Sequence, residues 1–176
     1  AGTFAEIAAD LEGVRRSSLA WGDYDGDGDL DILLTGIKSS NVRISRIYRN
    51  DAGTFEDIGA DLEGVDQSSV AWGDYDGEGD LDMLLTGTSP IATISKIYRN
   101  DAGTFVDIEA VLEGVRLSSV AWGDYDGDGD LDILMTGTTG FSRISKIYRN
   151  DAGAFTDIEA VLEGVNESSV GWADYD

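Results

Sequence analysis

The stretch WGDYDGDGDLDILLTG, from Trp21 to Gly36, decides the fold because the chain repeats it. It returns as WGDYDGEGDLDMLLTG from Trp72 and as WGDYDGDGDLDILMTG from Trp122, and a fourth copy begins at Trp172. Each full copy has acids at positions 1, 3, 5 and 9 of a nine-residue window and glycine at position 6. Short apolar runs flank the window, which predicts a strand, a loop and a second strand.

This spacing of carboxylates is typical of a calcium loop. Calcium takes about six to eight oxygen ligands, and alternating carboxylates converge on one ion when the backbone turns sharply at a glycine. The acids at positions 1, 3, 5 and 9 would offer side chains, and position 7 its backbone carbonyl. The predicted ligands are Asp23, Asp25, Asp27, Asp29 and Asp31; Asp74, Asp76, Glu78, Asp80 and Asp82; Asp124, Asp126, Asp128, Asp130 and Asp132; and, in the partial copy, Asp174 and Asp176. We expect about one Ca²⁺ per complete loop.

Two other interpretations of the acidic window are weaker. The helix-loop-helix calcium motif needs a bidentate Glu at position 12, where this chain has Leu34, Leu85 or Met135, and no helical pattern follows. A solvated acidic turn without metal would have to account for five carboxylates within nine residues, three times over.

Composition excludes several classes of protein. The 176 residues include 35 acids and 12 basic residues, for a net charge of −23, which three bound calcium ions would bring to −17. Such a surface should repel nucleic acid and anionic membranes, and no apolar run is long enough to insert into a bilayer. The chain has no Cys and no His, which removes thiol chemistry and the commonest general base.

The whole chain, residues 1–176, is one repeat region. AGTF at Ala1 returns at Ala52 and Ala102, and as AGAF at Ala152. The repeat units are approximately 1–51, 52–101 and 102–151, followed by the partial unit 152–176. A fixed period near fifty residues indicates a repeat architecture.

Each unit contains four strand-like segments. In the second copy they are Ser68–Asp76, Leu81–Gly87, Thr93–Asn100 and Thr104–Ala110. Four short antiparallel strands per unit predict an all-β fold of β-propeller blades, about 3.5 repeats in this chain. Two further strands are expected at the ends, at Thr3–Ala9 and Ser168–Asp176, giving fourteen in all.

The first strand of each unit has one bulky and one nearly bare face. In the second copy Val70 and Trp72 alternate with Ser69, Ala71 and Gly73. Neighbouring blades pack face to face, so large side chains of one blade need small ones on the next. We therefore interpret the tryptophans as inter-blade core; stacking on a sugar is the alternative.

The units resemble the FG-GAP or VCBS-type calcium-binding propeller repeats of integrin α-subunit heads and of bacterial secreted and surface proteins. The D-x-D-x-D-G-x-x-D pattern between two strands carries the resemblance, and the likeness covers the whole chain, which departs from the family in having too few blades. It implies calcium in the turn between the first and second strands, an extracellular setting, and adhesion or protein or glycan binding. It also implies a ring, seven-bladed in most cases, so missing blades or other copies of the chain would be needed to close it.

Two connections vary among otherwise similar copies. The turns between the second and third strands read IKSSNVR, TSPIA and TTGFSR, and the pairs before the first strands are Arg15-Arg16, Asp66-Gln67, Arg116-Leu117 and Asn166-Glu167. A four-stranded meander places both at the end opposite the calcium loops, where the apolar Ile91 and Phe141 suggest a recognition face. Drift on a solvent-exposed rim is the alternative.

No unique group of nucleophile, base and orienting residue appears, so we do not expect an enzyme, although a fragment of a propeller lyase or hydrolase is a third candidate. A scaffold or spacer with no specific ligand is the stronger rival to a binding module. Basic residues recurring on the third strand, such as Arg46, Lys96 and Lys146, are interpreted as partners of Asp57, Asp107 and Asp157.

Overall fold

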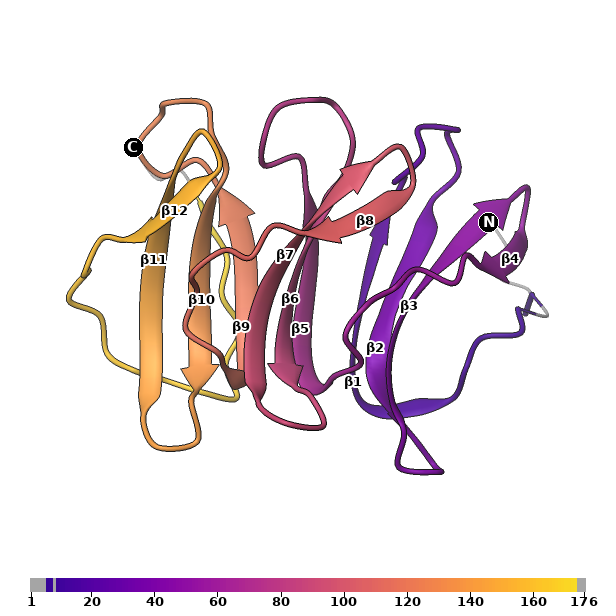
Figure 1. The fold of residues 1–176 in the computed structure, drawn as a ribbon, viewed down its shortest axis with the longest axis horizontal. Helices are drawn as coiled ribbons and strands as arrows, with labels where there is room; N and C mark the ends of the chain where they lie inside the picture. The colour runs from indigo at the N-terminus through magenta and orange to yellow at the C-terminus, as the bar shows by residue number, and fades with distance from the viewer. Residues whose placement is uncertain (1–5, 8, 174–176) are drawn as a thin grey trace, which may run out of the picture.

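The chain folds into three antiparallel sheets. The computed structural model describes residues 6–7 and 9–173, and these contain twelve strands and no helix. Each sheet is a four-stranded meander whose strands are neighbours in chain order (Figure 1). We call them blade 1 (β1 Val14–Gly22, β2 Asp31–Lys38, β3 Arg43–Asp51, β4 Thr54–Asp57), blade 2 (β5 Asp66–Gly73, β6 Asp82–Thr88, β7 Thr93–Asp101, β8 Thr104–Asp107) and blade 3 (β9 Arg116–Gly123, β10 Asp132–Thr138, β11 Arg143–Asp151, β12 Ala154–Asp157). The prediction of all-β, four-stranded blades is confirmed.

The strand bounds differ from the expected ones where the chain turns away. In blade 2 the first strand ends at Gly73 rather than Asp76, because Asp74 and Asp76 already belong to the acidic loop. The fourth strand ends at Asp107 rather than Ala110, because the chain then leaves the sheet through Glu109, whose φ is 56°.

The two additional end strands are not found in the described residues. Residues 168–173 form no strand, because no second strand of a fourth blade pairs with them, although they lie beside β9. The segment Thr3–Ala9 lies mostly outside the described residues, and Glu6, Ile7 and Ala9 are not in a strand. The predicted ligands Asp174 and Asp176 lie outside the described residues.

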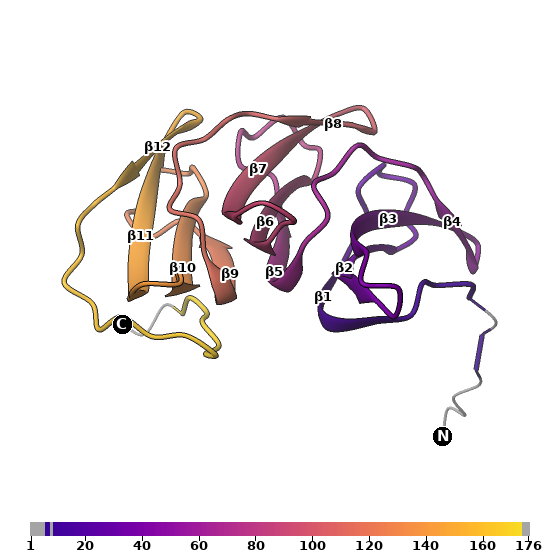
Figure 2. The same ribbon diagram turned by 60° about the horizontal axis from the view of Figure 1, so that its bottom comes forward.

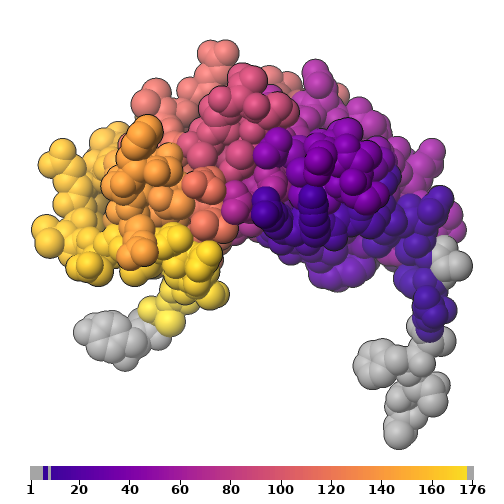
Figure 3. All heavy atoms as spheres, turned by 90° about the horizontal axis from the view of Figure 1, so that it is seen from below, coloured from indigo at the N-terminus to yellow at the C-terminus, as the bar shows by residue number. Residues whose placement is uncertain are grey.

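The blades stand side by side in an open arc (Figures 2 and 3). The strands β1, β5 and β9 lie on its inner side, and β4, β8 and β12 lie on its outer side (Figure 2). Two of the three clusters of buried apolar side chains lie between blades, and the third, Ile32, Leu34 and Tyr48, lies within blade 1. Leu33 and Ile47 of blade 1 share one cluster with Val65, Val70 and Met83 of blade 2, and all five are at most 8% exposed. A second cluster joins blades 2 and 3 in the same way.

Tryptophan and glycine form a close contact between blades. A Cβ atom added to Gly22 would lie 2.6 Å from Cδ1 of Trp72, and one added to Gly73 would lie 2.6 Å from Cδ1 of Trp122. Only a residue without a side chain can therefore face the indole. The inter-blade role predicted for the tryptophans is confirmed for Trp72 and Trp122.

Hydroxyl groups repeat along the same boundaries. Thr35 Oγ1 lies 2.8 Å from Ser68 Oγ across blades 1 and 2, and Thr86 Oγ1 lies 2.8 Å from Ser118 Oγ across blades 2 and 3. The two boundaries within the chain thus have the same geometry.

Candidate metal centres

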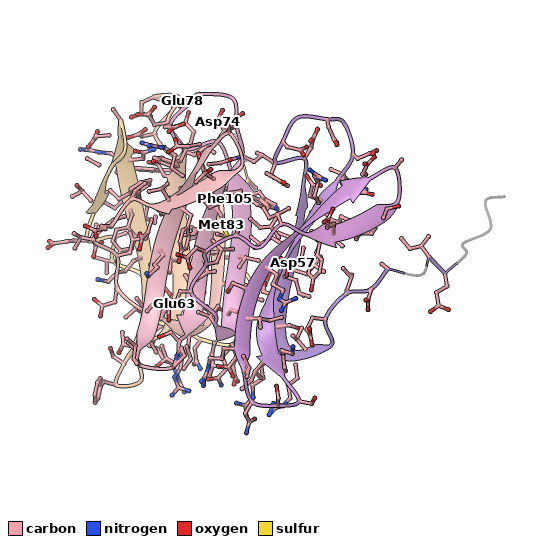
Figure 4. All side chains as sticks on the ribbon, turned by 45° about the vertical axis from the view of Figure 1, so that its right-hand side comes forward. Asp57, Glu63, Asp74, Glu78, Met83 and Phe105 are labelled. Carbon is pink, nitrogen blue, oxygen red and sulfur yellow. The ribbon has the colours of Figure 1, made fainter. Side chains whose placement is uncertain are left out.

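The three acidic loops connect β1 to β2, β5 to β6 and β9 to β10, and all lie at one end of the blades (Figure 1). The turns between β2 and β3, β6 and β7, and β10 and β11 lie at the opposite end, as predicted. Figure 4 shows Asp74 and Glu78 together in the loop of blade 2, with Phe105 and Met83 below them.

Short hydrogen bonds fold each loop back on itself. In blade 1, Asp23 Oδ2 accepts the N–H of Gly28 at 3.0 Å, and Asp27 Oδ1 accepts the N–H of Asp29 at 2.8 Å. Gly28 has φ of +96°, a conformation that glycine adopts without steric cost. The curled backbone predicted from the position-6 glycine is therefore present.

Three carboxylates converge in every loop. One oxygen from each member of a triad lies within 4.8 Å of the others, a spacing that could hold a metal ion. The triads are Asp23, Asp25 and Asp27; Asp74, Asp76 and Asp82; and Asp124, Asp126 and Asp132. The other predicted side-chain ligands, Asp31, Glu78 and Asp128, are not in the triads of their loops.

The acid at position 9 is buried and braces the loop. Asp31 is 0% exposed; its Oδ2 accepts the N–H of Tyr24 at 3.0 Å, and its Oδ1 accepts the N–H of Asn50 at 2.8 Å. Asp82 and Asp132 make the same two bonds in their blades. Position 9 thus ties the acidic loop to the third strand, and its remaining lone pairs can still serve a cation.

Without a counter-ion, burial and neighbouring negative charges destabilise the ionised carboxylates at position 9 of these loops. Burial raises the pKa of Asp82 to about 6, and the charges of Asp76 and Asp74 add to the shift against hydrogen bonds from the backbone N–H groups of Asn100 and Tyr75. Burial likewise raises the pKa of Asp31 and of Asp132.

The loops also contain carboxylate oxygens with no partner. Asp23 Oδ1 and Asp74 Oδ1 are inaccessible to solvent and accept no hydrogen bond. A buried, unpaired carboxylate oxygen is costly, and a bound cation would compensate it. The donor set is oxygen only, which suits a hard cation such as calcium.

An asparagine that the sequence analysis did not single out holds the loops to the next blade. Asn100 is 4% exposed; its Nδ2 donates to the carbonyl of Tyr24 in blade 1 at 2.9 Å and to that of Leu81 at 3.2 Å. Its Oδ1 accepts the N–H of Gly103. Asn150 of blade 3 repeats all three bonds, and the one to the carbonyl of Tyr75 reaches blade 2. The available signal was the RNDAG segment, identical in three turns.

Aromatic side chains of the next blade enclose the loop tyrosine. Tyr24 is 5% exposed, stacks on Trp72 with ring centroids 6.3 Å apart, and contacts Phe105 at 5.7 Å. Tyr75 has the equivalent neighbours Trp122 and Phe155. These tyrosines brace the acidic loop through their contacts with the adjacent blade.

The basic residues of the third strands neutralise acids away from the loops. Arg46 Nη1 lies 2.9 Å from Asp57 Oδ2, and the ammonium of Lys96 lies 2.9 Å from Asp107 Oδ2. Lys146 pairs with Asp157 in the same way. The three predicted ion pairs are confirmed.

A model described as FG-GAP-like repeat matches residues 23–85 and 91–135, and one described as FG-GAP repeat matches residues 117–156. The chain belongs to the FG-GAP-like repeat family. FG-GAP repeats commonly bind calcium, are typical of extracellular proteins and are generally not enzymes. No curated protein matches the chain. None of its described residues belongs to a helix long and apolar enough to cross a membrane.

Proposed function

We propose that this FG-GAP repeat chain binds one calcium ion in each of its three complete acidic loops and is a non-enzymatic extracellular module for adhesion or for binding protein or glycan. The observation that carries the proposal is the carboxylate triad found in all three loops. The ion would fix the connection between the first and second strands of each blade.

Calcium fits these loops better than other common metals. The loops offer oxygen atoms only, and the chain has no Cys or His to attract zinc or copper. Magnesium requires a near-ideal octahedron and retains its water, whereas calcium accepts irregular sets of carboxylates. Extracellular calcium modules bind in the range of about 0.1 to 1 mM, which suits a secreted or cell-surface protein.

The ligand surface in this proposal is the rim opposite the acidic loops. Ile91 is 91% exposed and Phe141 is 102% exposed at the tips of the β6–β7 and β10–β11 turns. Arg15 Nη2 donates to Asn41 Oδ1 at 3.0 Å, which joins a β2–β3 turn residue to a first-strand residue. Exposed apolar tips among variable polar residues suit protein or glycan recognition. A scaffold role without a ligand is the second candidate.

Calorimetric titration of the chelator-stripped chain with calcium tests the metal proposal, with magnesium as the control ion. We expect about three sites for calcium and none for magnesium, and the loss of one site each in Asp25→Ala, Asp76→Ala and Asp126→Ala. Absence of heat and of any stabilisation at millimolar calcium would overturn the proposal.

A glycan and protein array tests the rim. We expect binding that Ile91→Ser and Phe141→Ser abolish and that Val111→Ser preserves, since Val111 is 88% exposed but lies outside the variable turns. No binding at all, with the calcium sites intact, would favour the scaffold.

A further inference from the structure

The rim opposite the acidic loops is basic, although the chain as a whole is acidic. The rim consists of the turns 37–43, 88–92 and 138–143 and of the pairs 15–16, 66–67, 116–117 and 166–167. Figure 4 shows nitrogen atoms gathered below Glu63, at the end of the blades away from Asp74 and Glu78. These segments contain two acids, Asp66 and Glu167, and six of the chain's twelve basic residues: Arg15, Arg16, Lys38, Arg43, Arg116 and Arg143.

The net charge of −23 does not determine the electrostatic potential at this rim. The strand β5 has eight residues and spans about 26 Å, at about 3.3 Å per residue. The Debye length at physiological salt is about 8 Å, so the acidic loops at the far end are largely screened from the rim. An anion that approaches the rim is therefore attracted by the arginines near it.

Three of these arginines form one network that crosses both boundaries within the chain. Arg43 Nε of blade 1 donates to Asp66 Oδ1 of blade 2 at 2.6 Å, and Arg16 Nη1 of blade 1 lies 3.5 Å from Asp66 Oδ2. Arg116 Nη1 of blade 3 donates to Gln67 Oε1 of blade 2 at 3.1 Å. We call these five residues the arginine network. It has three guanidinium groups and one carboxylate, so positive charge is in excess.

The contacts within the network position the guanidinium groups and leave donors for a ligand. A guanidinium carries five N–H donors in a planar fork, and the bonds to Asp66 and Gln67 take one each from Arg43 and Arg116. Asp66 is 1% exposed, whereas the side chain of Arg16 is 60% exposed. Charged groups that are already held in place lose less conformational entropy when they bind a ligand.

The backbone also favours a role for the side chains at this rim. Arg16 and Gln67 lie at β-bulges and have φ of 52° and 51°, in the left-handed region that glycine adopts most easily. Leu117 and Glu167, at the same position of their copies, have φ of 48° and 52°. All four copies thus place a long side chain where glycine would cost less, and bulges commonly re-aim the side chain that they carry.

We propose that the arginine network binds a glycan that carries carboxylate or sulfate groups. The planar guanidinium matches the oxygen spacing of carboxylates and of tetrahedral oxyanions. Ser39, Ser40 and Asn41 are exposed in the turn that leads to Arg43, and their hydroxyl and amide groups can bond the hydroxyl groups of a sugar. An acidic peptide would supply the anions without those hydroxyl groups. This inference rests on the proposed function and specifies the class of ligand for the rim.

Surface plasmon resonance with a heparin oligosaccharide, in calcium and at physiological salt, tests the site. The test variant is Arg16→Gln with Arg116→Asn, because Gln67 and Asn166 occupy the same positions in other copies and both residues therefore fit the backbone. The control is Arg49→Gln with Arg149→Gln, which makes the same change in net charge on β3 and β11, where the two side chains are 44% and 42% exposed.

We expect the test variant to bind heparin about tenfold or more weakly than the unmodified chain, and the control to differ from it by less than about twofold. Neutral dextran should not bind. Raising the salt concentration should weaken heparin binding less in the test variant than in the control, because two charged contacts are gone.

Three results would overturn the proposal. They are no binding of heparin by the unmodified chain, equal weakening in the two double variants, and binding of polyglutamate as tightly as heparin, which would mean that charge alone is recognised. The array with Ile91→Ser and Phe141→Ser decides separately whether the rim binds another ligand. A rim that binds such a ligand but not heparin would refute this inference and support the proposed function.

Discussion

The acidic loops of blades 2 and 3 are nearly the same in sequence but differ in their surroundings. Tyr75 lies under Trp122 and Phe155 and is 5% exposed, while Tyr125 has Trp172 as its one aromatic neighbour among the described residues and is 37% exposed. The difference shows that a loop's burial is supplied by the following blade and not by its own residues. Stability and loop order are therefore properties of boundaries between repeats.

Tryptophan truncation should distinguish an inner boundary from an outer face most strongly. We expect Trp122→Ala to reduce the free energy of unfolding by about 3 to 5 kcal/mol, because it leaves a cavity beside Gly73. Trp21→Ala, at the exposed equivalent, should cost less than about 1 kcal/mol in the monomer. Urea unfolding at low protein concentration measures both, and equal losses would contradict the comparison.

Asparagine substitution should also reduce the free energy of unfolding more at an inner boundary than at an outer face, but by a smaller difference than tryptophan truncation. Asn100→Ala leaves the carbonyls of Tyr24 and Leu81 without their donor, so we expect a loss of about 1 to 3 kcal/mol. Asn50→Ala removes bonds within its own blade only, the one to Leu30 O and the one from the N–H of Gly53, and should cost less. Amide hydrogen exchange in the blade 1 loop should rise in Asn100→Ala alone; exchange that rises equally in both variants would count against a cross-blade clamp.

Through Asp82 of blade 2, lowering the pH should stabilise the calcium-free chain and destabilise the calcium-loaded chain. Because burial raises the pKa of Asp82 to about 6, the folded calcium-free chain binds this proton more tightly than the unfolded chain. This group therefore adds stability as pH falls from about 6 to 4, whereas in the loaded chain protons compete with the metal and stability falls.

Melting temperatures of the chain and of Asp82→Asn, measured from pH 4 to 7 with and without calcium, would show this. The difference between the two proteins isolates Asp82 from other carboxylates. If the calcium-free difference does not change with pH, the buried carboxylate has no raised pKa.

The smallest effect is expected on the surface of the third strands. Lys96 is partly exposed and pairs with Asp107, so Lys96→Ala should change stability by less than about 1 kcal/mol in either calcium state. Its loss should also shrink further at high salt. A loss as large as that of Asn100→Ala, measured by the same urea unfolding, would mean that this pair supports the boundary as well.

Repetition made most of this architecture predictable. The fifty-residue period, the Trp–Gly alternation and the acidic spacing predicted the blades, their inner boundaries and the places where carboxylates meet. These features are local or periodic, so one sequence is enough to show them.

What escaped prediction depends on neighbours distant in the chain. Asn100 lies near the end of β7, and only the folded boundary shows that it reaches Tyr24, seventy-six residues away. Residues 168–173 have the sequence of a first strand, but a strand needs a paired partner, which the described chain does not offer them. Asp82 belongs to the triad of its loop, whereas the equivalent Asp31 does not belong to the triad of blade 1. This difference reflects side-chain placement, which spacing in the sequence does not determine.

The Trp–Gly boundary also bears on how such a protein can change in length over evolutionary time. Since each boundary uses the same indole against the same bare backbone, a duplicated or deleted unit meets its new neighbours through a surface already fitted to them. Gene duplication can therefore change the number of units without requiring a new type of contact between them. Selection would then act on copy number and on the variable turns separately.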